Sequence, residues 1–502
     1  MKKLKIEVYS FYFKITILSP RLSKVITSLT SDLVTFSFRY DKWKKRVVSF
    51  PDKQYFRTIK KNHTYAFSVN MLSQFMNLLG RYGVTSDDLD ISLHKPHKPA
   101  KIKFNINKKY KIRDYQERYI DVLVNKDAKK FMLVDLRTGM GKGLISLEAI
   151  RRIKYKTLIM VKPGYIDKWI SDLLEYTDIT KDDIKVIKGY DALAKMIATK
   201  DTDYKFIIIS LVTLRNYVRD YETAKNTDID PATLLQKLKV GTVLNDETHQ
   251  HFHSVYMLTL YLNANRFIGL SATLDNNDKQ MRRMYEIIFP PDARINNLVK
   301  YEAYINVKAV EYELGSMYGL VYKRQQGYNH ILYEQSIIRR SVLLKNYISM
   351  IEAYFVSGYL SRRTEGDKVL IFCASVHLAT MMSNYFSTIY HDLTVNRYVE
   401  DDPYDNVVTG DVIISTPLSA GTALDIPNLI TVLMTVSVSS LQSNKQAIGR
   451  LRKLKDKEVT YIYFYTKDIP NHIKMERDRY RAIKDIAKSY KYIKYDKVLK
   501  QY

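Results

Sequence analysis

The sequence predicts an α/β protein with two tandem parallel-sheet lobes, preceded by a small α+β domain. Short apolar runs rich in β-branched residues alternate with helical or loop segments from about residue 106 onward. Strands buried on both faces of a parallel sheet have this continuous apolar character. The same rhythm starts again after about residue 305, so a second sheet of the same kind is expected.

The α+β domain is expected over residues 1–105. Residues 5–18 and 32–50 are rich in β-branched and aromatic residues, which indicates strands. Residues 69–80 carry apolar side chains at helical spacing, which indicates a helix. Residues 95–99 are polar and include two prolines, so a linker is expected there.

The two lobes are expected over residues 106–304 and 305–502. The strands expected in the first lobe are residues 131–134, 157–161, 206–210, 242–244 and 267–270. Those expected in the second lobe are residues 369–373, 412–415, 430–434 and 460–465. In the basic tail, residues 474–502, apolar side chains at helical spacing favour a surface helix on the second lobe over a strip that contacts phosphates.

Charge and cysteine usage narrow the classes of partner. The chain has 80 Lys and Arg against 53 Asp and Glu, a formal net charge of +27. This excess favours nucleic acid as a partner, although a lysine-rich composition alone would give the same balance. The single cysteine, Cys373, lies in an apolar run and is expected in a core. One cysteine cannot form a disulfide within the chain, which fits the reducing cytoplasm. No apolar run approaches the roughly 20 residues that cross a bilayer, so no membrane contact is expected.

A glycine-rich turn in the first lobe predicts a phosphate-binding loop. Residues 136–143, Leu-Arg-Thr-Gly-Met-Gly-Lys-Gly, lie between an expected strand and an expected helix. Backbone N–H groups of such a turn surround phosphates, and its lysine reaches the β and γ groups. The usual loop ends in Ser or Thr, whose hydroxyl binds Mg²⁺, but here Gly143 stands at that place. The expected nucleotide contacts are Thr138, Gly139, Met140, Gly141, Lys142 and Gly143.

An acidic pair follows another strand of the same lobe. Asp246 and Glu247 come directly after the expected strand at 242–244. Asp246 would hold Mg²⁺ and Glu247 would orient the attacking water, because ATP hydrolysis depends on positioning and charge stabilisation. Open α/β sheets bind ligands at the carboxyl ends of their strands, where both motifs lie. Together they predict a site that hydrolyses ATP with Mg²⁺.

With these motifs in place, residues 110–466 resemble superfamily 2 helicases of the DExH type, which implies RecA-like lobes. Residues 113–116 are similar to the motif whose glutamine reads adenine, so Arg113 and Gln116 are expected at the base. Lys162 and Pro163, with Trp169 six residues later, are similar to motif Ia. Residues 271–273 are similar to the Ser-Ala-Thr motif that couples hydrolysis to strand movement, which implies this role for Ser271 and Thr273.

The second lobe continues the resemblance. Residues 368–375 resemble motif IV, residues 415–427 resemble motif V, and residues 446–453 resemble motif VI. The family engages the γ-phosphate with a glutamine and two arginines, here Gln446, Arg450 and Arg452. The position of the family's second arginine is Lys453 in this sequence, so it stays open which basic residue serves as the arginine finger that contacts the γ-phosphate. The resemblance also implies that Asp425 contacts the nucleotide. The nucleic-acid contacts that it implies are Lys162, Thr213, Arg215, Thr416 and Thr422.

The layout is most similar to phage recombination helicases of the UvsW type, whose N-terminal domain has an aromatic and basic stretch similar to residues 38–43. This implies a monomeric, ATP-dependent DNA helicase or translocase acting on branched or forked DNA in recombination, repair or replication. An RNA helicase is one alternative, and a nucleic-acid binder with an ATPase weakened by Gly143 is another. Residues 42–46 would grip DNA or form a solvated turn with Trp43 in the core.

Overall fold

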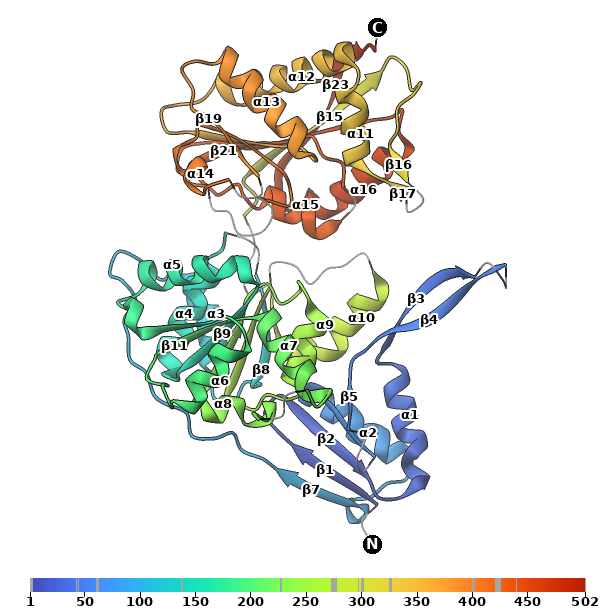
Figure 1. Ribbon diagram of the computed structural model, residues 1–502, viewed down its shortest axis with the longest axis vertical. Coiled ribbons are helices and arrows are strands. Elements are labelled where there is room, and N and C mark those ends of the chain that lie inside the picture. The colour runs from blue at the N-terminus through green and yellow to red at the C-terminus, as the bar shows by residue number, and fades with distance from the viewer. Residues whose placement is uncertain are drawn as a thin grey trace. The chain divides into compact units, whose positions relative to one another are not determined.

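The computed structural model describes residues 3–501, except 42, 44, 60–62, 137–138, 226–227, 272–277, 297, 299–301, 325–326, 400–401, 420–425 and 439. The chain divides near residue 299 into two compact units (Figure 1). The first unit contains the N-terminal domain and the first lobe, and the second contains the second lobe. No helix in the described part of the chain is long and apolar enough to cross a membrane.

The N-terminal domain is a five-stranded sheet in the order β5-β6-β2-β1-β7, with two helices beside it (Figure 1). Its strands pair antiparallel, except that β1 and β7 are parallel. The predicted helix is confirmed, because Phe75 and Leu79, four residues apart on α2, enter the core. The elements are β1 (Leu4–Val8), β2 (Tyr12–Ile17), α1 (Ser23–Ser31), β5 (Arg57–Ile59), β6 (Thr64–Ser68), α2 (Leu72–Arg81) and β7 (Leu89–Leu93).

A separate two-stranded ribbon projects from the first unit (Figure 1). It consists of β3 (Val34–Asp41) and β4 (Arg46–Gln54), paired antiparallel. Its base is anchored on α10 (Lys279–Ile288), because Gln280 exchanges two hydrogen bonds of 2.6 and 3.1 Å with the backbone of Phe36. Trp43, near the tip, is 98% exposed, so the interpretation that placed it in a core is wrong.

The first lobe is a seven-stranded parallel sheet in the order β10-β11-β9-β12-β13-β8-β14. Its five predicted strands are confirmed, whereas the short outer strands β10 and β14 were not predicted. The strands are β8 (Phe131–Asp135), β9 (Thr157–Val161), β10 (Ile184–Ile187), β11 (Phe206–Ser210), β12 (Thr242–Asn245), β13 (Arg266–Ser271) and β14 (Arg294–Ile295). The helices besides α10 are α3 (Asp114–Val124), α4 (Lys142–Ile153), α5 (Ile166–Tyr176), α6 (Tyr190–Ala198), α7 (Leu211–Glu222), α8 (Leu234–Lys237) and α9 (Phe252–Thr259).

An aromatic core joins the N-terminal domain to the first lobe. The ring of Phe11, between β1 and β2, lies 5.7 Å from that of Phe131 and 5.8 Å from that of Phe267. Asn70 donates hydrogen bonds of 3.2 and 2.9 Å to the carbonyl oxygens of Phe131 and Ile288. The buried residues of both parts belong to one hydrophobic cluster, so the first lobe and the N-terminal domain share a core.

Residues 100–107, directly after the predicted linker, are bound to the surface of the first lobe. The N–H of Ala100 donates to the carbonyl of Lys239, and that of Ile102 donates to the carbonyl of Lys154. The N–H of Asn107 in turn donates to the carbonyl of Tyr176. The two prolines give an extended backbone, and the lobe supplies its hydrogen-bond partners.

The second lobe is also a seven-stranded parallel sheet, in the order β19-β20-β18-β21-β22-β15-β23, which confirms the predicted fold class. The strands are β15 (Ile305–Leu314), β18 (Lys368–Phe372), β19 (Val395–Tyr398), β20 (Val412–Ser415), β21 (Leu429–Met434), β22 (Val459–Thr466) and β23 (Ala487–Leu499). Its helices are α11 (His330–Ile338), α12 (Ser341–Phe355), α13 (Val376–Ile389), α14 (Asp405–Thr409), α15 (Leu441–Ile448) and α16 (Pro470–Ile483). The short strands β16 (Lys323–Arg324) and β17 (Gly327–Tyr328) pair with each other outside this sheet.

The prediction of a helix through the basic tail is wrong beyond α16. Residues 487–499 form β23, which pairs in parallel with β15 at the edge of the sheet. Tyrosines 490 and 492 and lysines 488 and 494 fit a strand of period two better than a helix. The lysines are exposed, as is usual on an edge strand that must avoid pairing with another chain.

We expect Phe11→Ala to destabilise the first unit by about 3–5 kcal/mol, because it opens a cavity between Phe131 and Phe267. The free energy of unfolding by urea measures this loss. Leu18→Ala is the control, because Leu18 is an exposed apolar residue in the same domain. Equal stability of the two variants would mean that the domain and the lobe do not depend on this contact.

Candidate active site

The phosphate-binding loop and the acidic pair meet at one edge of the first sheet. Lys142 begins α4 directly after Gly141, whose φ of +79° is a conformation that glycine adopts without strain. Lys142 Nζ lies 3.1 Å from Glu247 Oε1, and their side chains are only 12% and 14% exposed. The structure therefore brings together a lysine and a carboxylate that are 105 residues apart in the sequence.

Asp246 is held in place by a tryptophan. Trp169 Nε1, on α5, donates a 2.9 Å hydrogen bond to Asp246 Oδ2, and the N–H of Glu247 donates to Asp246 Oδ1 at 2.9 Å. Trp169 is fully buried, so it fixes the carboxylate rigidly. The sequence marked Trp169 only as part of a motif, because no sequence pattern predicts this bond between residues 77 positions apart.

The loop between β12 and α9 is strained at the acidic pair. Glu247 has a φ of +50°, which is uncommon for a residue with a side chain. Its Oε2 is buried without a hydrogen-bond partner among the described residues, although His249 Nδ1 lies 3.4 Å away. Strain and an unsatisfied carboxylate oxygen are typical of functional sites.

His249 links the acidic loop to the predicted coupling motif. Its Nδ1 is 2.8 Å from the hydroxyl of Ser271, and the carbonyl of Ser271 accepts the N–H of Leu136 at the start of the phosphate loop. Burial, and secondarily the charge of Lys142, lower the pKa of His249 to about 3, so the imidazole is neutral. Thr273 lies outside the described residues, as does Thr138 of the phosphate loop.

The predicted adenine motif contacts the phosphate loop. Gln116 Oε1 accepts the N–H of Arg113 at 2.9 Å, which caps α3. The Gln116 amide and the Tyr115 hydroxyl both donate to the carbonyl of Met140, at 3.5 and 3.1 Å. The contact of Tyr115 was not expected from the sequence. Adenine recognition by Arg113 and Gln116 stays a prediction.

Gly143, the unusual residue of the loop, leaves room at the start of α4. Its carbonyl accepts the hydroxyl of Ser146 at 2.8 Å. A Cβ added at Gly143 would lie 3.5 Å from Asp172 Oδ2 and 3.9 Å from the Tyr176 ring, which are ordinary contacts. A Cβ at this position therefore fits without displacing the backbone.

Three basic groups lie near one another at the same edge of the first lobe. Burial lowers the pKa of Lys162, while the nearby Glu247 opposes the effect. The pKa of His251 is lowered by burial and then by the positive charges of Lys162 and Arg215. Thr213 is buried, and its hydroxyl is 2.9 Å from that of Ser210 at the start of α7. Its predicted contact with nucleic acid remains untested.

The second lobe positions its predicted site residues on and after α15. Gln446 is half-buried on this helix and Arg450 is buried. Arg479 of the neighbouring α16 donates a 2.7 Å hydrogen bond to Asn444, which fixes α15. Arg452 donates to the carbonyl of Gly449, whereas Lys453 is exposed and lies 2.7 Å from Glu302.

Other motifs of the second lobe are held by buried hydrogen bonds. Glu334 accepts the N–H groups of Ala374 and Ser375 at 2.6 and 2.7 Å, and burial raises its pKa to about 7. Thr416 is buried with its hydroxyl 3.0 Å from that of Ser419. Thr422 and Asp425 lie outside the described residues, so their predicted roles are untested.

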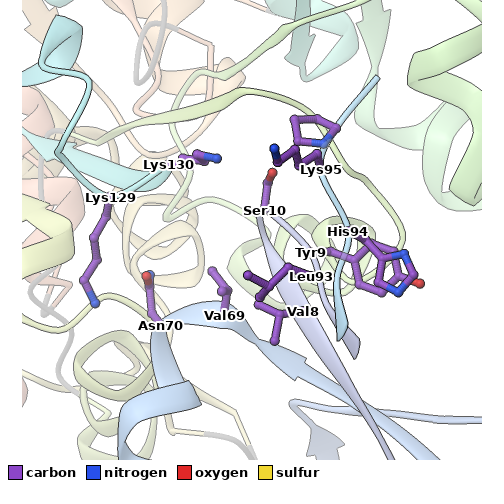
Figure 2. A pocket seen from close by; sticks show the side chains of 11 residues that line it. Val8, Tyr9, Ser10, Val69, Asn70, Leu93, His94, Lys95, Lys129 and Lys130 are labelled. Carbon is purple, nitrogen blue, oxygen red and sulfur yellow. The ribbon is translucent and has the colours of Figure 1, made fainter. Parts of the chain in front are cut away.

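A basic cavity of about 410 Å³ opens elsewhere in the first unit (Figure 2). Lys129 and Lys130, directly before β8, line it together with His94 and Tyr9, whose rings are stacked 4.6 Å apart. The cavity lies at the amino end of β8, whereas the phosphate loop follows the carboxyl end. It is therefore distinct from the site built around Lys142.

Fold and site together define a class: α/β proteins with two RecA-like lobes and a phosphate-binding loop facing an acidic pair. The family model described as "Type III restriction enzyme, res subunit" matches residues 109–276. A fragment of an HsdR subunit of a type I restriction enzyme from Vibrio vulnificus has a similar fold, with a TM-score of 0.51 and 14% identity over 96% of this chain and 82% of that one.

The chain is also similar to proteins named as helicases. It is 28% identical to the DNA 3'-5' helicase XPB of Kineococcus radiotolerans over 36% of this chain and 29% of that protein. It is 23% identical to the "General transcription and DNA repair factor IIH helicase/translocase subunit XPB" of Encephalitozoon cuniculi over 78% of this chain and 55% of that one. The "Putative ATP-dependent RNA helicase QP509L" of African swine fever virus is 23% identical over 41% and 38%.

The chain spans 29–55% of the length of these relatives. The chain is thus similar to several proteins named as helicases, whose usual cofactors are ATP and Mg²⁺. The first lobe fits this pair: Lys142 suits phosphates, Asp246 suits a metal ion, and the buried Glu247 Oε2 lacks a hydrogen-bond partner in the described structure.

We expect Gly143→Thr to preserve or raise the affinity for Mg²⁺–ATP, because it supplies the usual hydroxyl ligand in a space that admits a Cβ. Equilibrium binding of a fluorescent ATP analogue with Mg²⁺ measures the effect. A large loss of affinity would show instead that the phosphates approach the backbone at Gly143 so closely that only glycine is tolerated.

Proposed function

We propose that the protein is an ATP-dependent DNA helicase or translocase. The observation that carries the proposal is the meeting of Lys142 with Glu247, beside an Asp246 that Trp169 holds in place. A lysine at a helix N-terminus and two oriented carboxylates are the groups that phosphoryl transfer to water requires. The similarity to proteins named as helicases supports the same activity.

The residues of the first lobe divide the work between them. Mg²⁺ neutralises developing phosphate charge, and Asp246 is the residue that would hold it. Lys142 is paired with Glu247 in this structure. When ATP binds, the phosphates compete for Lys142, so the lysine exchanges Glu247 for the phosphates. Glu247 is then released to orient the attacking water. The neutral His249 passes a change at Glu247 to Ser271, and this path supports the coupling role of Ser271 and Thr273.

The second lobe supplies the positive charge that the transferring phosphoryl group needs. We assign this role to Arg450 and Arg452, with Gln446, on the resemblance of residues 446–453 to motif VI. A guanidinium suits it because its fork binds phosphate oxygens in pairs. Asn444 and Arg479 keep α15 in place for this task.

DNA is the proposed partner, gripped by its backbone. The net charge of +27 and the positive charges of Lys162 and Arg215 support phosphate contacts, which salt would weaken strongly. On the resemblance to UvsW-type helicases, we propose branched or forked DNA in recombination, repair or replication as the substrate, and a monomer in the cytoplasm, of the host cell if a phage encodes it.

The ribbon of β3 and β4 is proposed as a second contact with DNA. Its alternation places Phe36, Phe38 and Tyr40 on one face, where all three are exposed, and Arg39 on the other. Exposed aromatic rings next to basic side chains suit the stacking of unpaired bases. Its anchor, α10, belongs to the first lobe, so the ribbon is fixed to the lobe that carries the predicted nucleotide site.

An RNA helicase is the second candidate, because the African swine fever virus relative is named as one. The phosphate contacts proposed above do not separate DNA from RNA, since both offer the same phosphates. Competition of matched DNA and RNA forks for the site that stimulates ATP hydrolysis distinguishes the two candidates.

Lys142→Ala should reduce DNA-stimulated ATP hydrolysis by at least about a hundredfold, because it removes the charge that stabilises the transferring phosphoryl group. Lys126→Ala, an exposed lysine of the same lobe, should keep the wild-type rate. Release of phosphate with and without forked DNA is the measurement. Equal rates for Lys142→Ala and wild type would favour a nucleic-acid binder without ATPase activity.

Trp43→Ala should weaken binding to forked DNA by about 1–3 kcal/mol, the range for one stacked base, without changing ATP hydrolysis in the absence of DNA. The other tryptophan, Trp169, is fully buried, so added DNA should quench mainly the fluorescence of Trp43. Tyr82→Ala, another exposed aromatic residue of this domain, is the control. Unchanged affinity and fluorescence would remove the ribbon from the DNA path.

A further inference from the structure

A carboxylate from another helix lies beside the place where the usual loop carries its hydroxyl, at Gly143. Asp172 lies on α5, about one turn before this helix ends at Tyr176. Its Oδ2 would be 3.5 Å from a Cβ at Gly143, and a Ser or Thr hydroxyl sits one bond beyond that Cβ. An oxygen of Asp172 therefore lies close to where the usual loop has its oxygen ligand.

Asp172 is tied to the rest of the acidic site. Lys168, one turn earlier on α5, lies 2.8 Å from Asp172 Oδ2. Burial opposes the charge on Lys168, but the carboxylates of Asp246 and Asp172 outweigh it and raise the pKa of the ammonium. Burial, and then the charge of Asp246, raise the pKa of Asp172. Trp169, three residues before Asp172 on α5, donates its hydrogen bond to Asp246, so both carboxylates lie on the same side of this helix, with the ammonium of Lys168 beside Asp172.

A divalent cation would neutralise the negative charges of Asp172 and Asp246 better than the ammonium of Lys168 does alone. Mg²⁺ takes only oxygen ligands and is usually bound by one or two carboxylates together with phosphates. Asp246 provides the first carboxylate, held by Trp169. Without a hydroxyl at Gly143, the site has one ligand fewer unless a neighbour supplies it.

We infer that Asp172 supplies the Mg²⁺-ligand oxygen, direct or through water, that the phosphate loop lacks at Gly143. Lys168 holds the carboxylate in position and offsets its negative charge near the phosphates. The carboxylate of Asp172 on α5 would then replace the hydroxyl ligand that position 143 on α4 lacks. This inference rests on the proposed ATP-hydrolysing function.

The test is the Mg²⁺ dependence of binding of a fluorescent, non-hydrolysable ATP analogue to the full chain. Asp172→Ala should raise the Mg²⁺ concentration for half-saturation by about tenfold or more. Binding of the analogue in the absence of Mg²⁺ should not weaken, because only a negative charge has been removed. Asp167→Ala, an exposed acid on the same helix, should match wild type.

Rescue makes the test specific. Gly143→Ser in the Asp172→Ala background should return the Mg²⁺ dependence to within about threefold of wild type, because the hydroxyl restores an oxygen ligand. Asp172→Asn, which keeps the shape, serves if Asp172→Ala does not fold, and it should show the same loss.

Two results overturn the inference while the proposed function stands. One is an Asp172 variant whose Mg²⁺ dependence stays within twofold of wild type. The other is a loss that Gly143→Ser does not reverse. If the wild-type chain itself shows no Mg²⁺-dependent binding of the analogue, the proposed function fails first.

Discussion

The direction of the strands decides where the chemistry of the first lobe can occur. In the order β9-β12-β13-β8, all strands are parallel, so the loops that follow β8, β12 and β13 emerge at the same edge. Lys142, Asp246 and Ser271 come from these three loops or their ends. A single reversed strand would send one of them to the opposite edge and separate the lysine from the carboxylates. The site therefore depends on backbone pairing more than on any one side chain.

The contacts around this edge form a chain of linked groups. The loop carbonyl of Met140 accepts hydrogen bonds from Tyr115 and Gln116, and Lys142 pairs with Glu247. His249 then connects the acidic loop to Ser271, whose carbonyl returns to the start of the phosphate loop. Each group is held by the next, and these contacts support the proposed coupling between the phosphate loop and Ser271.

The N-terminal domain is rigidly attached to the first lobe through a shared hydrophobic core. Phe11 lies against rings of β8 and β13, and these two strands carry the phosphate loop and the coupling motif at their other ends. The ribbon is likewise anchored on α10 through Gln280. A domain attached by a flexible linker would move independently of the nucleotide site. The shared core and the hydrogen-bonded segment 100–107 make the domain and the lobe one unit. A force on the ribbon would therefore act directly on the lobe.

The sequence by itself determined the two parallel sheets and the loops that carry Lys142 and Asp246, because buried strands and glycine-rich turns have strong local signatures. It did not determine the edge strand β23, since Ile486, Tyr490 and Ile493 also fall at helical spacing and only the pairing with β15 fixes a strand there. It marked Trp169 without its bond to Asp246, and it gave no sign of Asp172. Those placements depend on contacts between distant parts of the chain, because the packing of α5 against α4 and the bond of Trp169 to Asp246, which follows β12, bring the groups together.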